Sequence, residues 1–410
     1  MNHKPIQLLN VFYHADKKYH MGRLASRDRK IWFEYSPEFI ATGFELSPFK
    51  LPLQPNAVSA DTNAFDGLHG VFNDSLPDGW GRMLLDRQVA KYGIARHLLT
   101  PLDRLSHVGK YGMGALSYEP EYSEDAQLEE NLDLTKLAEE MQQILEGEGD
   151  DALLKLKQLA GSSGGARPKI TAKVSPDKKH IMSQTSSYPD GYEDWLIKFN
   201  SRFDDADSGK IEYAYSIIAK DSGINMPETY LFNTSTGSYF GVQRFDRDSG
   251  RRIHMHSLCG LIHSDYRFPS LDYSDLLKVT QVLTKDMREV EAAFRLACFN
   301  VIMHNRDDHS KNFSFLYIEK EWKLSPAYDL TFSSGPNGYQ SMTVIGESLK
   351  PTLTHLKELG TKANIKKTER IIDQVLASAI RWKDTAASLN ISDSTIKNID
   401  QIINSHMKAG

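Results

Sequence analysis

The chain has 410 residues, the length of two to three domains at about 100–200 residues each. Hydrophobic residues make up 40% and charged residues 25%, ordinary values that exclude collagen, a disordered chain and a coiled coil. The formal net charge of −5 excludes a dedicated polybasic nucleic-acid-binding protein. Two cysteines, and no apolar run long enough for a signal peptide or a membrane helix, predict a cytoplasmic protein without disulfides.

The first 150 residues (1–150) are predicted to form an α+β subdomain. Alternating apolar residues at 31–35 predict a strand, and the turn-rich segment 73–81 is expected to open a helix over about 82–92. Residues 119–151 contain 13 acidic residues and one basic residue, which leaves 48 basic and 41 acidic residues, about +7, on the rest of the chain. Helical spacing of apolar residues predicts an exposed amphipathic helix at 134–145, and we place a domain boundary at residue 150.

Residues 151–250 are predicted to form a sheet lobe and residues 251–410 a helical lobe. Sheet-lobe strands are expected at 169–174, 179–182, 195–199, 228–232 and 238–244, with a helix at 211–221. Helices of the second lobe are expected at 287–304, 366–382 and 394–407, with a hairpin at 312–318 and 322–324. This is the element order of a protein kinase. The predicted fold class is α+β: a two-lobed protein-kinase-like fold with an added N-terminal α+β subdomain and a helical C-lobe.

The segment Asn305–Asn312 has the spacing of a kinase catalytic loop. Asp307 and Asn312 are five residues apart, like the Asp base and the Asn metal ligand of such loops. Asp329 follows the predicted hairpin and would complete a Mg²⁺ site, since Mg²⁺ prefers oxygen ligands together with phosphate oxygens and water. Lys311 beside them would add positive charge toward the transferred phosphate.

The glycine-rich segment Gly161–Lys169 is the candidate phosphate loop. Glycines allow backbone N–H groups to approach phosphate oxygens closely, although the Walker A pattern is absent. Lys198, on the expected strand that follows, would contact the phosphates, with Glu212 as its expected ion-pair partner. Backbone groups at 243–245 would face the adenine.

A second interpretation of the same region is a metal-dependent phosphohydrolase, because imidazole and carboxylate groups bind transition metals. The candidate ligands are His304, Asp307, Asp308 and His309, with His254 and His256 elsewhere in the chain. The spacing of these last two histidines is expected to place them on the two faces of a strand rather than in one pocket.

Six segments of the chain resemble the HipA-type serine/threonine kinases, the toxin components of bacterial toxin–antitoxin pairs. They lie in family order along most of the chain: Ser75–Arg82, Ser162–Lys169, Trp195–Phe199, Val242–Arg247, Asn305–Ser314 and Leu324–Asp329. The block Asp-x-His-x-Lys-Asn-Phe-Ser with the downstream Pro-x-Tyr-Asp is the specific part. The chain departs from the family pattern at Gln243, where glutamate is usual, and at Arg167-Pro168, where Gln-Glu is commoner.

The resemblance implies an ATP- and Mg²⁺-dependent kinase that phosphorylates serine or threonine. Asp307 would be the catalytic base, and Asn312 and Asp329 would hold Mg²⁺. Ser162 would be the autophosphorylation site, with Ser163 as the other candidate, and a phosphate there would repel those of ATP. The implied ATP-binding residues are Ser163, Gly164, Gly165, Ala166, Lys198, Gln243, Arg244, Phe245, His309, Lys311 and Asn312.

The resemblance also implies partners. They are a protein substrate in translation, such as an aminoacyl-tRNA synthetase, and a helix-turn-helix antitoxin that binds operator DNA, so that the kinase meets DNA indirectly. No membrane association is expected. An alternative from another class is an inactive kinase-like module that acts only as a co-repressor with its partner. The intact set of Lys198, Asp307, Asn312 and Asp329 favours the enzyme.

Overall fold

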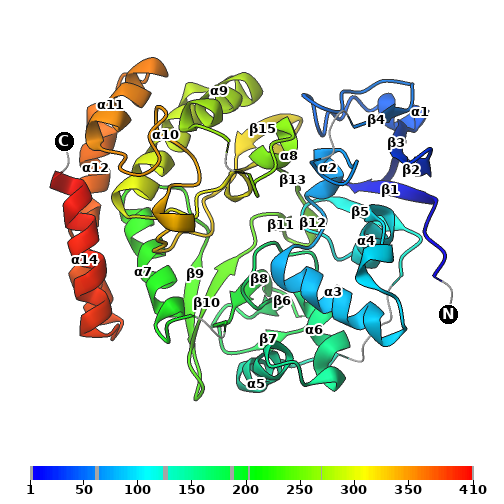
Figure 1. The fold of residues 1–410 in the computed structure, drawn as a ribbon, viewed down its shortest axis with the longest axis horizontal. Helices are drawn as coiled ribbons and strands as arrows, with labels where there is room; N and C mark the ends of the chain where they lie inside the picture. The colour runs from blue at the N-terminus through cyan, green and yellow to red at the C-terminus, as the bar shows by residue number, and fades with distance from the viewer. Residues whose placement is uncertain are drawn as a thin grey trace. The chain divides into compact units, whose positions relative to one another are not determined.

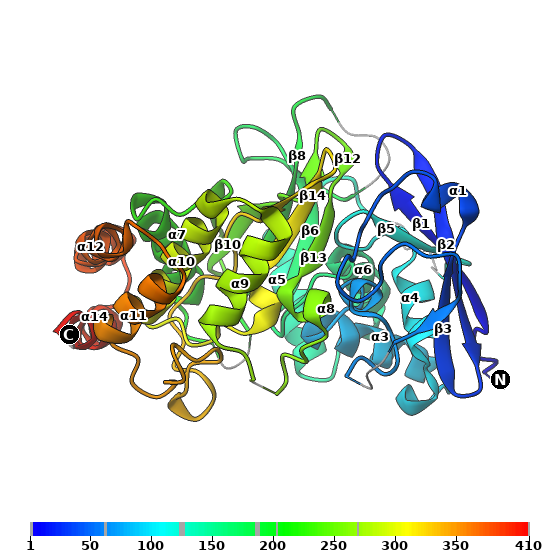
Figure 2. The ribbon, with the colours of Figure 1, turned by 90° about the horizontal axis from the view of Figure 1, so that it is seen from above.

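The computed structural model describes residues 3–60, 64–122, 128–184, 189–201, 204–268 and 270–408 (Figures 1 and 2). The chain divides into two compact units. Unit 1 comprises Met1–Asp205, Phe232–His256 and Gly260–His263, and unit 2 comprises Ala206–Leu231, Ser257–Cys259 and Ser264–Gly410. Unit 1 therefore contains residues from both sides of position 150, and the predicted boundary there stays a prediction.

The strands, in chain order, are β1 (Leu8–His14), β2 (Lys18–Arg27), β3 (Lys30–Tyr35), β4 (Val58–Ser59), β5 (Leu116–Glu119), β6 (Lys169–Val174), β7 (Ile181–Met182), β8 (Glu193–Lys198), β9 (Thr229–Asn233), β10 (Ser238–Gln243), β11 (Arg247–Asp248), β12 (Arg251–Arg252), β13 (His254–Ser257), β14 (Ser314–Ile318) and β15 (Glu321–Leu324).

The α-helices, in chain order, are α1 (Pro37–Ile40), α2 (Gly70–Asn73), α3 (Gly79–Lys91), α4 (Pro101–Val108), α5 (Leu134–Leu145), α6 (Leu153–Ala160), α7 (Ser208–Asp221), α8 (Leu258–Ile262), α9 (Tyr273–Thr284), α10 (Met287–Ile302), α11 (Leu353–Lys362), α12 (Thr368–Ala379), α13 (Trp382–Ser388) and α14 (Asp393–Lys408).

The N-terminal part of unit 1 is built on an antiparallel sheet with the strand order β4-β3-β2-β1-β5. Alternate side chains of β1 are buried, the pattern of a strand with one face on a core. The helix α4 begins at a capping box in which Thr100 and Asp103 satisfy each other's backbone amides. The Asp103 carboxylate also accepts the amide of Ile6, which ties α4 to the start of the sheet.

A second sheet of unit 1 carries the candidate phosphate loop. Its strand order is β7-β6-β8-β10, and the end of β9 that belongs to unit 1 lies next to β10. Alternation places Ile170, Ala172, Trp195 and Ile197 on one face, where they join a buried cluster with residues of α3, α5 and α6. Figure 1 shows these helices beside the sheet. The opposite face carries Lys169 and Lys198.

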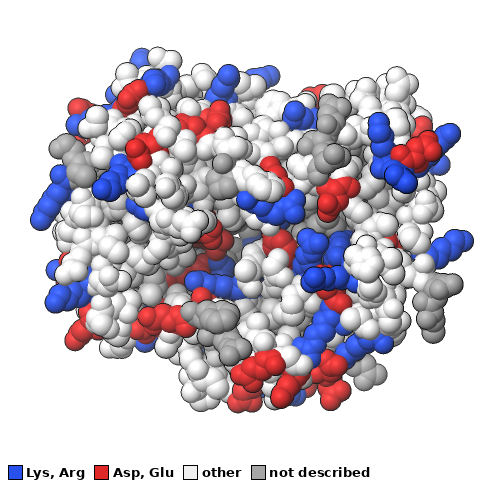
Figure 3. Space-filling view, in the orientation of Figure 1, with Lys and Arg blue, Asp and Glu red and all other residues white. Residues whose placement is uncertain are grey.

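The acidic segment is more buried than predicted. The helix α5 has the predicted bounds, and its residues Leu134, Leu137, Met141 and Ile144 pack into the core of unit 1. The Arg87 guanidinium donates to backbone carbonyl oxygens at the end of α5 and just after it, those of Ile144, Gly147 and Glu148. In Figure 3, acidic side chains gather at the lower edge, where α5 lies in Figure 1. Residues 123–127 of this segment lie outside the described residues.

Unit 2 is organised around the buried helix α10. Asp286 caps its N-terminus by accepting the amide of Arg288, and α9, α11, α12 and α14 pack around it. The hairpin β14–β15 follows α10 after the segment 303–313. Among the described residues, no helix is both long and apolar enough to cross a membrane.

Candidate active site

The loop after α10 is held by a buried aspartate. Asp308 is 1% exposed, and its carboxylate accepts hydrogen bonds from the Tyr273 hydroxyl, the Gln340 amide at 2.8 Å and the backbone N–H of Ser341 at 2.9 Å. Burial raises the pKa of Asp308 to about 6 despite these donors. The neighbouring Asp307 side chain is 55% exposed. One aspartate therefore anchors the loop, and the other is presented to solvent.

A backbone contact explains the five-residue spacing of Asp307 and Asn312. The Asn312 Nδ2 donates to the Asp307 carbonyl oxygen at 2.7 Å, across a 3₁₀ turn at Ser310–Asn312. The imidazole of His309 lies 3.8 Å from the Asp307 carboxylate. Because Nδ2 is used in this way, the Asn312 Oδ1 is the atom oriented to accept or to ligate.

Tyr328 ties Asp329 to the same loop. The Tyr328 hydroxyl donates to the Lys311 carbonyl oxygen at 2.7 Å and lies 2.6 Å from the Ser314 hydroxyl. Asp329, the next residue, has a φ of +58°, a left-handed conformation that costs free energy for a residue other than glycine. Unit 2 thus holds Asp307 and Asn312 on one loop, and Tyr328, next to Asp329, contacts that loop.

The donors in this region suit Mg²⁺ better than a transition metal. Across the described residues, no group of three His, Cys, Asp or Glu side chains is placed to hold a metal ion. Mg²⁺ does not require such a cage, because it is bound by one or two protein oxygens with phosphates and water. The Asn312 amide oxygen and the Asp329 carboxylate fit that requirement.

Three of the four histidines of the hydrolase interpretation, His304, His254 and His256, are engaged elsewhere. His304 Nδ1 lies 2.7 Å from His406 Nε2 in unit 2. In unit 1, His254 Nε2 lies 2.9 Å from the Leu46 carbonyl oxygen, and His256 lies between Ser47 and Asp74. The expectation that His254 and His256 occupy opposite faces of a strand is wrong, because residues two apart on a strand share a face and their rings are 6.1 Å apart.

Ser47, His256 and Asp74 have the connectivity of a nucleophile, a base and an orienting acid. The Ser47 Oγ is 3.1 Å from His256 Nε2, and His256 Nδ1 is 2.6 Å from the Asp74 carboxylate. However, Ser47 is 1% and His256 0% exposed, and Gly260 lies so close that a Cβ there would overlap both His256 and Asp74. A substrate cannot reach the serine, so we interpret the trio as a buried structural network.

The His304–His406 pair makes unit 2 sensitive to acid. Burial lowers the pKa of His304 to about 3 and that of His406 to about 4. Both are neutral when folded, so their contribution is present above the unfolded pKa of about 6.5 and is lost as the pH falls below it. We expect a loss of about 1 kcal/mol per histidine between pH 6.5 and 5.5.

Thermal unfolding at pH 5.5 and 7.5 measures this effect. The His406→Gln variant keeps a hydrogen-bonding side chain at that position and cannot be protonated in this range, so its unfolding temperature should fall less with acid than that of the wild type. Protonation of Asp308, whose pKa is about 6, stabilises the fold in the same pH range and so acts in the opposite direction. The quantity to compare is therefore the fall in unfolding temperature between pH 7.5 and 5.5, in the wild type and in His406→Gln. Identical pH profiles would contradict the assignment.

The two serines of the candidate phosphate loop are buried in unit 1. Ser162 is 2% and Ser163 1% exposed. The Ser162 Oγ accepts the Met113 amide at 2.8 Å, and the Ser163 hydroxyl donates to the Ala160 carbonyl oxygen at 2.7 Å. Neither hydroxyl is open to a reaction partner in this conformation, so phosphorylation of either requires the loop to move.

Two lysines occupy opposite positions on β6 and β8, the first of which directly follows this loop. Lys169 on β6 and Lys198 on β8 are direct partners in antiparallel register, so their side chains share a face. The Lys169 Nζ donates to the Gly164 carbonyl oxygen, and the Lys198 Nζ lies 5.9 Å from the centre of the Phe240 ring. Like charges in this arrangement repel unless an anion lies between or near them. Lys169, the last residue of the candidate phosphate loop, is therefore a further candidate site residue.

The segment expected at the adenine carries a buried ion cluster. The Arg244 guanidinium donates to Asp246 at 2.9 and 2.8 Å, and the Arg244 amide donates to the Asp194 carbonyl oxygen at 2.7 Å. The Arg244 side chain is therefore committed to Asp246. Gln243 and Phe245 are both half-buried, at and just after the end of β10.

The predicted site residues divide between the units. Ser162–Ala166, Lys198 and Gln243–Phe245 belong to unit 1, whereas His309, Lys311, Asn312, Asp307 and Asp329 belong to unit 2. Glu212, the expected partner of Lys198, is buried in unit 2, and this ion pair stays a prediction.

A sheet-rich unit with a glycine-rich loop and a helical unit with an Asp–Asn loop define a two-lobed, kinase-like α+β fold. Two family models match the chain: the HipA N-terminal domain over residues 9–119 and the HipA-like C-terminal domain over residues 161–383. The second alone covers more than half of the chain, so the protein belongs to the HipA-like family.

Three known proteins are similar to all or part of the chain. The HipA toxin from Shewanella oneidensis MR-1, solved with HipB and operator DNA, is similar over 97% of this chain and 95% of its own, with a TM-score of 0.68 and 16% identity. A protein of Haemophilus influenzae described as a putative kinase is 24% identical over 192 residues, 42% of this chain. The chain spans about half (53%) of the length of that relative. The Helicobacter pylori proinflammatory kinase CtkA has a TM-score of 0.43 and 12% identity over 60% of this chain and 90% of its own.

Proposed function

We propose that the protein is an ATP- and Mg²⁺-dependent serine/threonine protein kinase and the toxin of a toxin–antitoxin pair. The observation that carries the proposal is the loop Asp307–Asn312: a buried Asp308 holds it, an exposed Asp307 is presented on it, and Asn312 folds back onto it. Asp329, in its left-handed conformation, is tied to the same loop through Tyr328.

Each residue has a distinct proposed role. The Asp307 carboxylate accepts the proton of the substrate hydroxyl while the hydroxyl oxygen attacks the γ-phosphorus of ATP. The bond between the γ-phosphorus and the oxygen that bridges it to the β-phosphate breaks, and ADP leaves. Asn312 and Asp329 hold Mg²⁺, which neutralises charge on the phosphates when bound. Lys198 and Lys169 supply positive charge from unit 1, and backbone N–H groups of the glycine-rich loop provide hydrogen bonds.

We further propose that Ser162 is the autophosphorylation site, with Ser163 as the alternative acceptor. A doubly charged phosphate would not fit where Ser162 is buried against the Met113 amide, so the modified loop would be held out. The proposed partners are a helix-turn-helix antitoxin, through which operator DNA is bound, and a translation protein as substrate, such as an aminoacyl-tRNA synthetase. The Shewanella HipA complex with HipB and operator DNA supports the first.

The experiment that tests the proposal is incubation of the purified chain with Mg²⁺ and γ-labelled ATP, with mass spectrometry to locate the label. We expect label on Ser162 or Ser163, less of it in Ser162→Ala, and none with EDTA. ATP binding by calorimetry separates the other outcomes. Binding without label points to a missing protein substrate, whereas neither binding nor label rejects the kinase and favours an inactive co-repressor module.

A further inference from the structure

The first residue before α3 does not act as a helix cap. Asp78 occupies the N-cap position, where aspartate normally accepts an amide of the first helical turn, but no such bond is formed. By contrast, Asp133 at the same position of α5 accepts the amides of Thr135 and Lys136. Another contact therefore determines where the Asp78 carboxylate lies.

The carboxylate of Asp78 binds the glycine-rich loop instead. The Gly165 amide donates to the Asp78 Oδ1, 87 positions away in the chain. In the opposite direction, the Trp80 amide donates to the Gly165 carbonyl oxygen at 3.1 Å. Both backbone groups of Gly165 are thus bound by one short segment of the N-terminal subdomain.

Close backbone approach makes this contact specific. Gly79 has a φ of +37°, and a Cβ at this position would overlap the Gly165 carbonyl and the Ala166 Cα. Trp80, which follows, is 1% exposed and packs in the core of unit 1. The Asp78-Gly79-Trp80 segment is consequently fixed to the core on one side and to the loop on the other.

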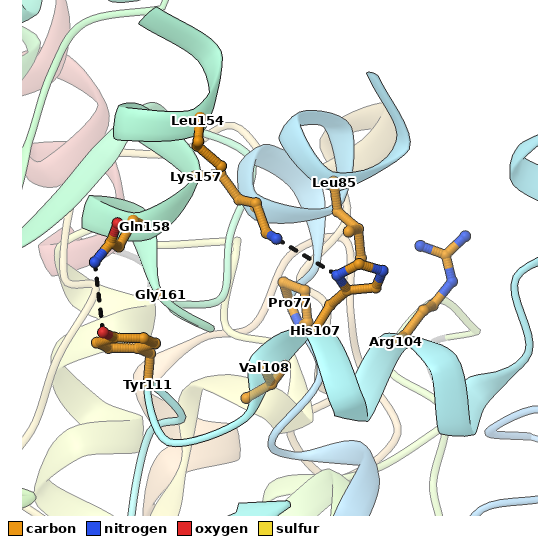
Figure 4. A pocket seen from close by; sticks show the side chains of 11 residues that line it. Pro77, Leu85, Arg104, His107, Val108, Tyr111, Leu154, Lys157, Gln158 and Gly161 are labelled. Atoms are coloured by element: carbon orange, nitrogen blue, oxygen red, sulfur yellow. Dashed lines mark hydrogen bonds between the residues drawn. The ribbon is translucent and has the colours of Figure 1, made fainter. Parts of the chain in front are cut away.

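The beginning of the loop borders a small open pocket. Gly161 lines it together with residues of α3, α4 and α6 (Figure 4). Pro77 and Gly81, which flank the Asp78-Gly79-Trp80 segment, line it from the α3 side. Farther along the loop, the hydrogen bonds to Ser162 and Gly165 hold it to the Met113 amide and to Asp78.

We infer that Asp78 is a positioning residue for the glycine-rich loop: by binding the Gly165 N–H it sets the other N–H groups of the loop for phosphates, without touching the nucleotide. This inference deepens the proposed kinase function and rests on it. Asp78→Ala frees Gly165, so the KM for ATP should rise about tenfold while kcat changes less than about threefold, the pattern of lost ground-state binding. Asp78→Asn keeps the accepting Oδ1 and should recover most of the affinity.

Hydrogen exchange of peptides covering 161–169 tests the contact without reference to activity. We expect at least tenfold faster exchange in Asp78→Ala, near wild-type exchange in Asp78→Asn, and no change in Asp133→Ala, a helix-cap variant of the same unit. Unchanged loop exchange in Asp78→Ala would overturn the inference. If Asp78→Ala does not fold, Asp78→Ser replaces it, because the shorter side chain cannot reach Gly165 in the same way.

The two failures can be distinguished. If the wild-type chain neither binds nor hydrolyses ATP, the kinase proposal is rejected while loop exchange still reports whether Asp78 orders the loop. Suppose instead that the wild type is active, and that Asp78→Ala shows faster loop exchange but an unchanged KM for ATP. Asp78 then orders the loop without affecting ATP binding, and the positioning role is rejected.

Discussion

Replacing Asp307 by asparagine is expected to lower the rate of phosphoryl transfer by about 10³-fold, the size of effect that removal of a general base produces. The Asp307 side chain is 55% exposed, so the free energy of unfolding should change by less than about 0.5 kcal/mol. Asparagine cannot accept the substrate proton, although its shape is nearly the same. ATP affinity should remain within a few-fold of wild type.

The matched control is the adjacent residue. Asp308 is buried and accepts hydrogen bonds from Tyr273, Gln340 and the Ser341 amide. Asp308→Asn would turn an NH₂ group toward these donors and should lower the free energy of unfolding by about 1–3 kcal/mol. Label transfer, calorimetry with ATP and thermal unfolding of both variants provide the comparison. If Asp307→Asn retains more than a tenth of the wild-type rate, Asp307 is not the base.

The largest expected effect on stability is at Asp246. Its carboxylate is 1% exposed and accepts from Arg244, from the Arg247 guanidinium at 2.8 Å and from the Gly114 amide at 2.7 Å. Removing one member of a buried ionic network leaves the remaining charges unpaired, which typically costs about 3–5 kcal/mol. We expect Asp246→Ala to lose this amount in urea unfolding, a large fraction of the usual stability of a domain.

The effect should spread to the neighbouring loop. Arg247 and Arg252 also donate to the carbonyl oxygens of Gly112 and Gly114, which hold the segment that presents the Met113 amide to Ser162. Loss of Asp246 should therefore loosen Ser162 as well as lower stability. If Asp246→Ala does not fold, Asp246→Asn is expected to show a smaller loss in the same direction.

An exposed acidic residue of the same stretch provides the control. Asp248 pairs with Arg251 near the surface, and Asp248→Ala should cost less than about 1 kcal/mol. The pH dependence gives a second check. Burial alone would raise the pKa of Asp246, but the Arg244 and Arg247 guanidinium groups hold it well below its usual value. The contribution of Asp246 to the free energy of unfolding is complete above about pH 4 and is lost as the pH falls below it. If Asp246→Ala and Asp248→Ala lower the free energy of unfolding equally, the assignment is contradicted.

The elements predicted from sequence were those with a strong local signal. Periodicity gave the bounds of α5 and β6 to the residue, and the order of strands and helices led to the kinase-like fold. The short helices α4 and α6 were not predicted, although Thr100 and Asp103 form a capping box that the sequence contains. Helices of eight residues show too little periodicity to stand out.

The same distinction applies to the candidate site. Asp307, Asn312 and Asp329 lie within 23 positions of one another, so motif spacing could find them, whether or not their proposed roles are correct. Contacts between distant residues have no such signal. The Asp78–Gly165 bond and the Asp246–Gly114 bond join residues 87 and 132 positions apart, and only the folded chain brings them together. Tyr328, next to Asp329 in the chain, belongs to the Pro-x-Tyr-Asp motif, but its hydrogen bond to the Lys311 carbonyl oxygen is visible only in the structure.

The register of β6 and β8 determines on which face of the sheet Lys169 and Lys198 lie. The two residues are direct partners, so both side chains leave the sheet on the face opposite the buried cluster. A slip of one residue between the strands would turn one of the two lysines toward that cluster. On the proposed function, the strand pairing that keeps the core apolar also keeps positive charge on the side that serves the phosphates.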